Sequence, residues 1–230
     1  MSVNVMPINL GAVKSFLLVG GKKRLVLVDT GNPDDGERIA RKVEEAGYRP
    51  SDISLIILTH GHRDHVGGVS ELVRISGAKV VIGKDDAPLL KGKEAPGFFP
   101  VGLKGRILKS LMSVAERMML EEEGKADYPE MEEIDEEEVS LQGFGIKGKI
   151  INTPGHTSGS LSVLLQDGSV IVGDLVMGRF FTFGGASYPV FASDMGLLKH
   201  SIEKILKFGP GTIYVSHGGP YGPEDLENLL

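Results

Sequence analysis

The stretch Thr59-His60-Gly61-His62-Arg63-Asp64-His65 decides how the rest of the chain is interpreted, because it holds three of the six histidines and an aspartate. It directly follows the apolar run Leu55-Ile56-Ile57-Leu58, which predicts a buried strand. Further along, residues 70–75 place apolar side chains at helical spacing. The histidines are therefore expected on a loop between a strand and a helix, a usual position for an active site in layered α/β folds. So dense a cluster of imidazole and carboxylate groups suits zinc, iron or manganese, and the plainer alternative is a polar surface turn.

Size and composition narrow the class of protein. A chain of 230 residues can bury one sizeable core, so a single domain over residues 1–230 is expected. No signal-peptide pattern and no run of eighteen apolar residues is present, which predicts a cytoplasmic chain without a membrane partner. The absence of cysteine removes disulfides and thiolate ligands, so His, Asp and Glu must hold any metal. The basic residues form no block, which favours a small-molecule substrate over a nucleic-acid partner.

The predicted elements are strands and helices in two strand-rich halves. Strands are expected at residues 3–8, 15–19, 24–28, 55–58 and 79–82, and again at 139–142, 147–152, 160–165, 169–172 and 212–215. Helices are expected at 34–46, after Gly68, and at 194–208. This order predicts an α/β protein with two sheets packed together and helices outside them.

Residues 83–138 interrupt this pattern. They contain a Gly- and Pro-rich segment, a helical stretch at 103–120 with one apolar face, and an acidic run. The stretch 116–138 contributes −10 to the net charge of −6, so the rest of the chain carries +4. We interpret 83–138 as a helical cap inserted in the domain. Its apolar stripe is a packing surface, a lid over a substrate pocket, or a contact through which the chain forms an oligomer.

Three further candidate ligands each follow a predicted strand and have small residues beside them, which lets loops converge on a shared ion. With the first cluster they make seven, which are too many for one tetrahedral metal and suit two metals that share a carboxylate. The seven candidates are His60, His62, Asp64, His65, His156, Asp174 and His217.

These motifs resemble the metallo-β-lactamase superfamily. The resemblance runs through Asp29, the T-H-x-H-x-D-H stretch at residues 59–65, Pro154-Gly155-His156-Thr157, Gly173-Asp174 and Ser216-His217-Gly218. It implies an αββα sandwich with a dinuclear metal site at one edge. It also implies roles for single residues: a first metal on His60, His62 and His156, a second on Asp64, His65 and His217, Asp174 as the bridge, and Asp29 as a support that is not itself a ligand.

The resemblance further implies a reaction class. Two divalent ions, zinc first with iron or manganese as alternatives, would hold a bridging hydroxide and polarise a substrate oxygen. Asp174 would lower the repulsion between the cations and Asp64 would supply a second anion, so both are predicted to be catalytic. True β-lactamases of this fold lack the bridging aspartate, whereas the glyoxalase II-like branch has it. We therefore predict hydrolysis of a thioester, ester or lactone. Glyoxalase II proper carries an additional helical domain with glutathione contacts, whereas this chain stops thirteen residues after His217. Glutathione specificity is therefore not expected.

Other functions stay open at this point. A mononuclear iron persulfide dioxygenase would keep the same histidine stretch and use the first site alone. A phosphodiesterase acting on RNA or nucleotides is disfavoured by the acidic balance, and a metal-binding scaffold without catalysis is disfavoured by the complete ligand set.

Several further residues are assigned provisional roles. Orienting contacts to the imidazoles are expected from Asp29, Thr59, Thr153 and Ser216, although Asp29 could equally accept the amides of its own turn. His200 is expected on a helix surface. Substrate binding or loop packing is expected for Arg179 and Tyr188.

Overall fold

Two β-sheets form the centre of the molecule in the computed structural model, which describes residues 3–21, 24–90, 99–101, 128–178 and 185–230. In the first sheet the strand order is β1-β2-β3-β4-β5-β7. The first three strands pair antiparallel, and from β3 onward all pairs are parallel. The strands are β1 (Asn4–Asn9), β2 (Lys14–Val19), β3 (Leu25–Val28), β4 (Ile53–Ile57), β5 (Lys79–Gly83) and β7 (Glu132–Ile134).

The second sheet has the order β15-β11-β10-β9-β8. Its strands pair antiparallel except for the parallel pair β11 and β15. They are β8 (Glu138–Ser140), β9 (Gly148–Asn152), β10 (Leu161–Leu165), β11 (Ser169–Ile171) and β15 (Thr212–Tyr214). Two short ladders lie outside the sheets and join β12 (Met177–Gly178) to β13 (Ala186–Ser187) and β14 (Phe191–Ala192) to β6 (Phe99–Pro100).

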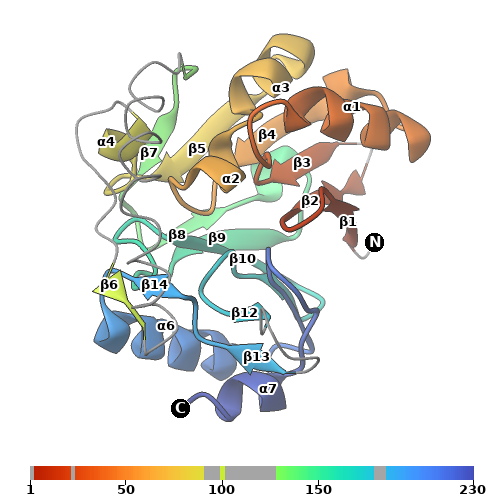
Figure 1. Ribbon diagram of the computed structural model, residues 1–230. Helices are drawn as coiled ribbons and strands as arrows, with labels where there is room; N and C mark the ends of the chain where they lie inside the picture. The colour runs from red at the N-terminus through yellow and green to blue at the C-terminus, as the bar shows by residue number, and fades with distance from the viewer. Residues whose placement is uncertain (1–2, 22–23, 91–98, 102–127, 179–184) are drawn as a thin grey trace.

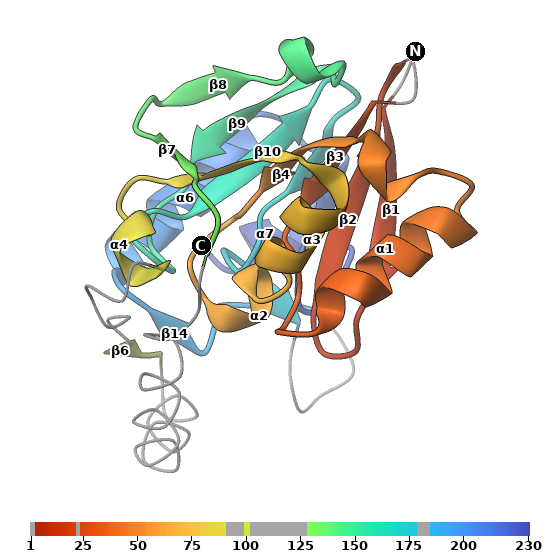
Figure 2. The ribbon, with the colours of Figure 1, turned by 90° about the horizontal axis from the view of Figure 1, so that it is seen from above.

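Helices cover the outer face of each sheet (Figure 1). The first sheet lies under α1 (Asp35–Glu45) and α3 (Val69–Ser76), as the view from above shows (Figure 2), and the second lies against α6 (Met195–Lys207) and α7 (Pro223–Glu227). Three apolar clusters fill the spaces between these four layers. The predicted αββα sandwich is therefore confirmed. Single turns at α2 (Arg63–Val66), α4 (Ala87–Leu90), Pro50–Asp52 and Gln142–Phe144 complete the helical elements that the structure describes.

The strand β4 explains why an unbroken apolar run precedes the histidines. Its alternate side chains enter different clusters: Ile56 packs under the helices, whereas Leu55 and Ile57 pack between the two sheets. A strand that is buried on both faces needs apolar residues at consecutive positions. The core therefore anchors the segment from which the histidine loop leaves.

Helix boundaries lie within a residue of the predicted ones, because local signals fix them. The predicted helix 34–46 is α1, flanked by Asp34 and Ala46, and the chain turns away at Gly47 with φ +85°. The predicted helix 194–208 is α6. Its N-cap is Asp194, whose carboxylate accepts hydrogen bonds from the amides of Gly196 at 2.7 Å and Leu197 at 2.9 Å.

The predicted insertion ends earlier than residue 138. Residues Glu132–Ile134 form β7, which pairs with β5 at the edge of the first sheet, and Ile134 is buried between the sheets. The acidic composition hides this strand from sequence analysis, because two exposed glutamates precede its single buried side chain. At the other end, α4 begins at Ala87. The predicted cap helix at 103–120 lies outside the described residues.

Two features near the C-terminal half were not predicted. The loop expected at 178–191 contains β13 and the start of β14 among its described residues, and Pro223–Glu227 forms α7. Within the described residues, no helix combines the length and apolar character that crossing a bilayer requires.

Candidate metal centre

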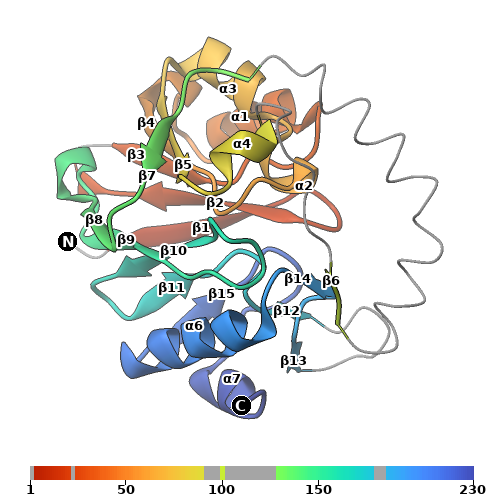
Figure 3. The same cartoon turned by 90° about the vertical axis from the view of Figure 1, so that its left-hand side faces the viewer.

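The candidate ligands come from four loops that each follow a strand. His60, His62, Asp64 and His65 follow β4, His156 follows β9, Asp174 follows β11, and His217 follows β15. In Figure 3, α2 lies above and β12 and β14 lie below on the same side of the sandwich. His62 is the N-cap of α2, so one helical turn carries the chain from His62 to Asp64 and His65. Residues from both sheets therefore meet at one edge.

The first group contains His60, His62 and His156. The Nδ1 atom of His62 lies 3.0 Å from the Nε2 atom of His60 and 3.0 Å from the Nε2 atom of His156. Two nitrogens bound to one tetrahedral zinc at about 2.0–2.1 Å lie roughly 3.3 Å apart. The spacing of these ring nitrogens is therefore close to that of ligands on a single ion.

The second group contains Asp64, His65 and His217. The Oδ2 atom of Asp64 lies 3.3 Å from Nε2 of His217 and 3.7 Å from Nε2 of His65. Asp174 lies between the groups: its carboxylate is 3.6 Å from His65, 3.5 Å from His217 and 3.8 Å from His156, measured to Nε2. The structure thus brings all seven candidate residues together.

The polar atoms inside this cluster fit a cation. Nε2 of His65 and Oδ1 of Asp174 are buried and have no hydrogen-bond partner among the described residues, although they face each other at 3.6 Å. The histidines also present lone pairs inward. In His156 and His217 the Nδ1 atoms donate outward, to the carbonyls of Phe191 and Ala12 at 2.9 Å, which directs each Nε2 inward, where its lone pair can bind a metal once the imidazole is neutral. Nitrogen and oxygen donors of this kind suit zinc and other borderline divalent metals.

The histidines of the two groups differ in their pKa values in the metal-free protein. Burial lowers the pKa values of His60, His62 and His156, that of His62 to about 3, so this group is neutral near pH 7. Burial opposes protonation of His65 and His217 as well, but Asp174 and Asp64 outweigh it and raise both pKa values.

The two ligand carboxylates respond in the opposite sense. Burial alone would raise the pKa of Asp174, yet His65 and His217 lower it to about 2. The pKa of Asp64 falls well below its usual range for the same reason. Both carboxylates are therefore anionic in the metal-free protein and can bind a cation without first losing a proton.

A fully buried carboxylate, Asp29, connects the loops of the cluster. Its oxygens accept hydrogen bonds from the Thr59 amide at 2.7 Å, the Thr59 hydroxyl at 2.8 Å and Nδ1 of His65 at 2.8 Å. The hydroxyl of Ser216 adds a longer contact at 3.4 Å. Asp29 thus bonds across to other loops, and the amides of its own turn at Thr30 and Gly31 are not its partners. Thr59 in turn lies 3.0 Å from Nδ1 of His60.

Other expected contacts lie elsewhere. The hydroxyl of Thr153 pairs with Ser162 at 2.7 Å and not with an imidazole. Tyr188 donates its hydroxyl proton to the carbonyl of Leu229, and its ring lies 5.8 Å from Nζ of Lys199, so it packs near the C-terminus. Of the two roles expected for Tyr188, these contacts correspond to loop packing. Arg179 lies outside the described residues.

Sequence reasoning missed Asp86, a buried carboxylate on the turn after β5. It accepts hydrogen bonds from the Gly61 amide, the Thr157 hydroxyl and the Gly159 amide, at 2.7 to 2.9 Å. Burial raises its pKa. A signal was available: Asp86 follows the strand beside β4 in a parallel pair, and the carboxyl ends of parallel strands meet at one edge.

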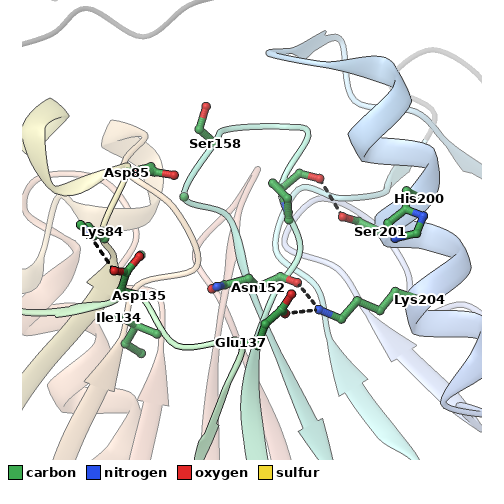
Figure 4. A pocket seen from close by; sticks show the side chains of 13 residues that line it. Lys84, Asp85, Ile134, Asp135, Glu137, Asn152, Ser158, His200, Ser201 and Lys204 are labelled. Carbon is green, nitrogen blue, oxygen red and sulfur yellow. Dashed lines mark hydrogen bonds and ion pairs between the residues drawn. The ribbon is translucent and has the colours of Figure 1, made fainter.

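A separate pocket of about 260 Å³ lies beside this cluster and is lined by none of the seven candidates (Figure 4). Its lysines are already paired, Lys84 with Asp135 at 2.6 Å and Lys204 with Glu137 at 2.8 Å. His200 lines its rim on α6 with a side chain that is 70% exposed, as predicted for a surface position. Because no candidate ligand lines this pocket, it is not part of the candidate metal centre.

A sequence model of the Metallo-beta-lactamase superfamily matches residues 8–217, which is most of the chain. The chain belongs to this superfamily. One superfamily relative, the Beta-lactamase-like protein 2 homolog of Drosophila melanogaster, is 27% identical over 226 residues, covering 95% of this chain and 62% of the fly protein. This chain thus spans less than two thirds of that relative.

Two further comparisons extend the superfamily assignment. The Probable metallo-hydrolase YflN of Bacillus subtilis is 26% identical over 227 residues, covering 89% of this chain and 79% of the bacterial protein. Among solved structures, a metallo-beta-lactamase family protein from Thermus thermophilus gives a TM-score of 0.66 at 18% identity, covering 99% of this chain and 77% of the other. At that identity the likeness is one of fold alone.

Proposed function

We propose that this superfamily member is a metal-dependent hydrolase that holds two divalent ions and cleaves a thioester, ester or lactone of a small molecule. The observation that carries the proposal is the pair of three-residue groups that meet at Asp174, with orphaned buried atoms of His65 and Asp174 facing each other. The seven side chains exceed the four ligands of one tetrahedral ion, which favours two ions over one. A relative described as a probable metallo-hydrolase supports the same reaction class.

Each group would hold one ion. His60, His62 and His156 would bind the first, Asp64, His65 and His217 the second, and Asp174 would contact both, since it lies within 3.8 Å of histidines of each group. When bound, two divalent ions supply a hydroxide nucleophile near neutral pH and polarise the oxygen of the scissile bond.

The residues of the chain prepare this chemistry. Asp29 holds the Nδ1 proton of His65, so the Nε2 lone pair of His65 stays directed inward. Asp174 is 6% exposed and Asp64 is 38% exposed, which places Asp64 on the open side of the cluster. We infer that a substrate approaches over Asp64, while Asp174 stays shielded between the groups.

The presence of Asp174 favours the glyoxalase II-like branch over antibiotic hydrolysis, as the sequence resemblance implies. Zinc is the proposed metal because imidazole and carboxylate ligands suit it, with iron or manganese as alternatives. The substrate is proposed by class only: an acyl compound with a carbonyl carbon open to attack.

Metal analysis tests the proposal directly. Protein purified without chelators should contain about two ions per chain, and a panel of thioesters, esters and lactones should include a substrate whose turnover stops on chelation and returns with added zinc. One iron per chain, with oxygen consumed in the presence of a persulfide, would show that the mononuclear dioxygenase is the correct reaction and would overturn the proposal.

A further inference from the structure

Asp86 makes its hydrogen bonds to one part of the metal centre. Its Oδ2 atom accepts from the Gly61 amide at 2.8 Å and from the Thr157 hydroxyl at 2.7 Å, and its Oδ1 atom accepts from the Gly159 amide at 2.9 Å. Gly61 lies between His60 and His62, and Thr157 follows His156. Within the part of the chain that the structure describes, all three bonds thus reach loops that carry the first histidine group. The bonded Gly61 lies directly between His60 and His62, whereas Asp64 and His65 follow further along the same loop.

The backbone packs tightly at the same place. A Cβ atom on Gly159 would lie 2.6 Å from the amide nitrogen of Asp86, and one on Gly83 would lie 2.0 Å from the carbonyl oxygen of Gly159. On Gly61 it would lie 2.9 Å from a methyl carbon of Leu89. The contacts of Gly159 and Gly83 are with backbone atoms and therefore require glycine, whereas the Leu89 side chain could move to admit a Cβ on Gly61. The turn after β5 thus touches both histidine loops directly.

The two loops that Asp86 connects come from different sheets. His60 and His62 follow β4 of the first sheet, and His156 follows β9 of the second. Their ring nitrogens nevertheless lie 3.0 Å apart across this junction, from His62 to His156. A small relative shift of the loops would change that spacing directly, and Asp86 holds both loops at once.

We propose that Asp86 is a positioning residue that sets the metal affinity of the His60, His62 and His156 group, and leaves the Asp64, His65 and His217 group unaffected. This inference rests on the proposed function, because it requires that the histidines bind metal. Asp29 differs from Asp86 in this respect, since its contacts with Thr59 and His65 reach both groups.

The test replaces Asp86 by asparagine in the full-length chain. Asparagine keeps the volume but offers one acceptor oxygen and an amide group that would face hydrogen-bond donors. The matched control is Asp85→Asn, which makes the same charge change on the neighbouring exposed residue, whose side chain lies at the pocket (Figure 4).

Zinc binding is followed in two ways. Chelator competition should show that Asp86→Asn lowers the affinity of one site for zinc by about 10–100-fold. The affinity of the other site should stay within twofold of wild type. Spectra of protein labelled with ¹⁵N-histidine identify the weakened site, because only six histidines contribute. The ring signals of His62 and His156 should require more zinc to shift, those of His217 should shift as in wild type, and His200 serves as the reference.

A second variant keeps the proposal testable if Asp86→Asn does not fold. Thr157→Val removes one donor to Asp86 and leaves both glycine amides in place, so a smaller weakening is expected at the same site. Equal weakening at both sites, or none in either variant, would overturn the assignment of Asp86. Wild-type protein in which zinc shifts none of the clustered histidines would instead overturn the proposed function.

Discussion

Replacing Asp29 by asparagine should destabilise the metal-free fold strongly. The Oδ2 atom of Asp29 accepts from the Thr59 hydroxyl and from Nδ1 of His65, both at 2.8 Å, and all of these groups are buried. Asparagine can keep the bond from the Thr59 amide to Oδ1, but its amide group would then face two donors. The backbone adds no strain, because asparagine tolerates the φ of +60° at this position.

The magnitude follows from the two lost bonds. A hydrogen bond to a charged group contributes about 1.5–3 kcal/mol, so the substitution should cost about 3–6 kcal/mol of unfolding free energy. A chain of this size loses about 2–4 °C in melting temperature per kcal/mol, which predicts a fall of about 6–24 °C. Thermal unfolding measured with a chelator present separates this effect from metal binding.

Asp34→Asn is the matched control. Asp34 also has a positive φ, of 73°, but it is exposed and its side chain makes no capping bond to α1. Its variant should unfold within about 0.5 kcal/mol of wild type. If Asp29→Asn melted within the range of that control, the role of Asp29 as the connection between these loops would be refuted.

Three further predictions concern the site itself. Asp174→Asn should lose at least one metal ion and most hydrolytic activity, because it removes the anion between the two groups; full metal content with normal turnover would contradict the shared-ligand assignment. His200→Ala should leave metal content and turnover within about twofold of wild type, as expected for an exposed side chain, and a large loss with metal intact would reveal a substrate contact. The raised pKa values of His65 and His217 favour their protonated forms in the metal-free protein, so zinc must displace protons and binds more tightly as the pH rises. Calorimetric titration at pH 6.5 in two buffers of different ionisation enthalpy should show this proton release, and identical heats after subtraction of dilution would contradict it.

The sequence predicts the layers and the clustering because local patterns determine both. A run of apolar residues at every position requires a strand buried on two faces, and β4 has this burial. Ligands placed after several strands approach one another when those strand ends lie at the same edge of the sandwich, and the loops after β4, β9 and β15 bring His60, His156 and His217 into one cluster in this way.

Contacts between distant segments could not be predicted in the same way. Asp86 resembles any acidic turn residue until the loops of Gly61 and Gly159 pack against it. Tyr188 lies in a loop that could face either the metal centre or the C-terminus, and only the tertiary packing shows that it reaches Leu229. The acidic composition of the segment around Ile134 was also misleading. It suggested an insertion, whereas the buried side chain of Ile134 fixes this segment at the edge of the first sheet.

The parallel pairing of β5 with β7 fixes both ends of the segment between them. The chain leaves β5 at Gly83 and enters β7 at Glu132, whose register partner is Val81, so the first sheet holds the two ends on neighbouring strands. Closing a longer connection between fixed neighbouring ends costs only about 0.6 kcal/mol for each doubling of its length. The length of the connection between α4 and β7 can therefore change at low cost, while Asp86, the two sheets and the metal centre are kept.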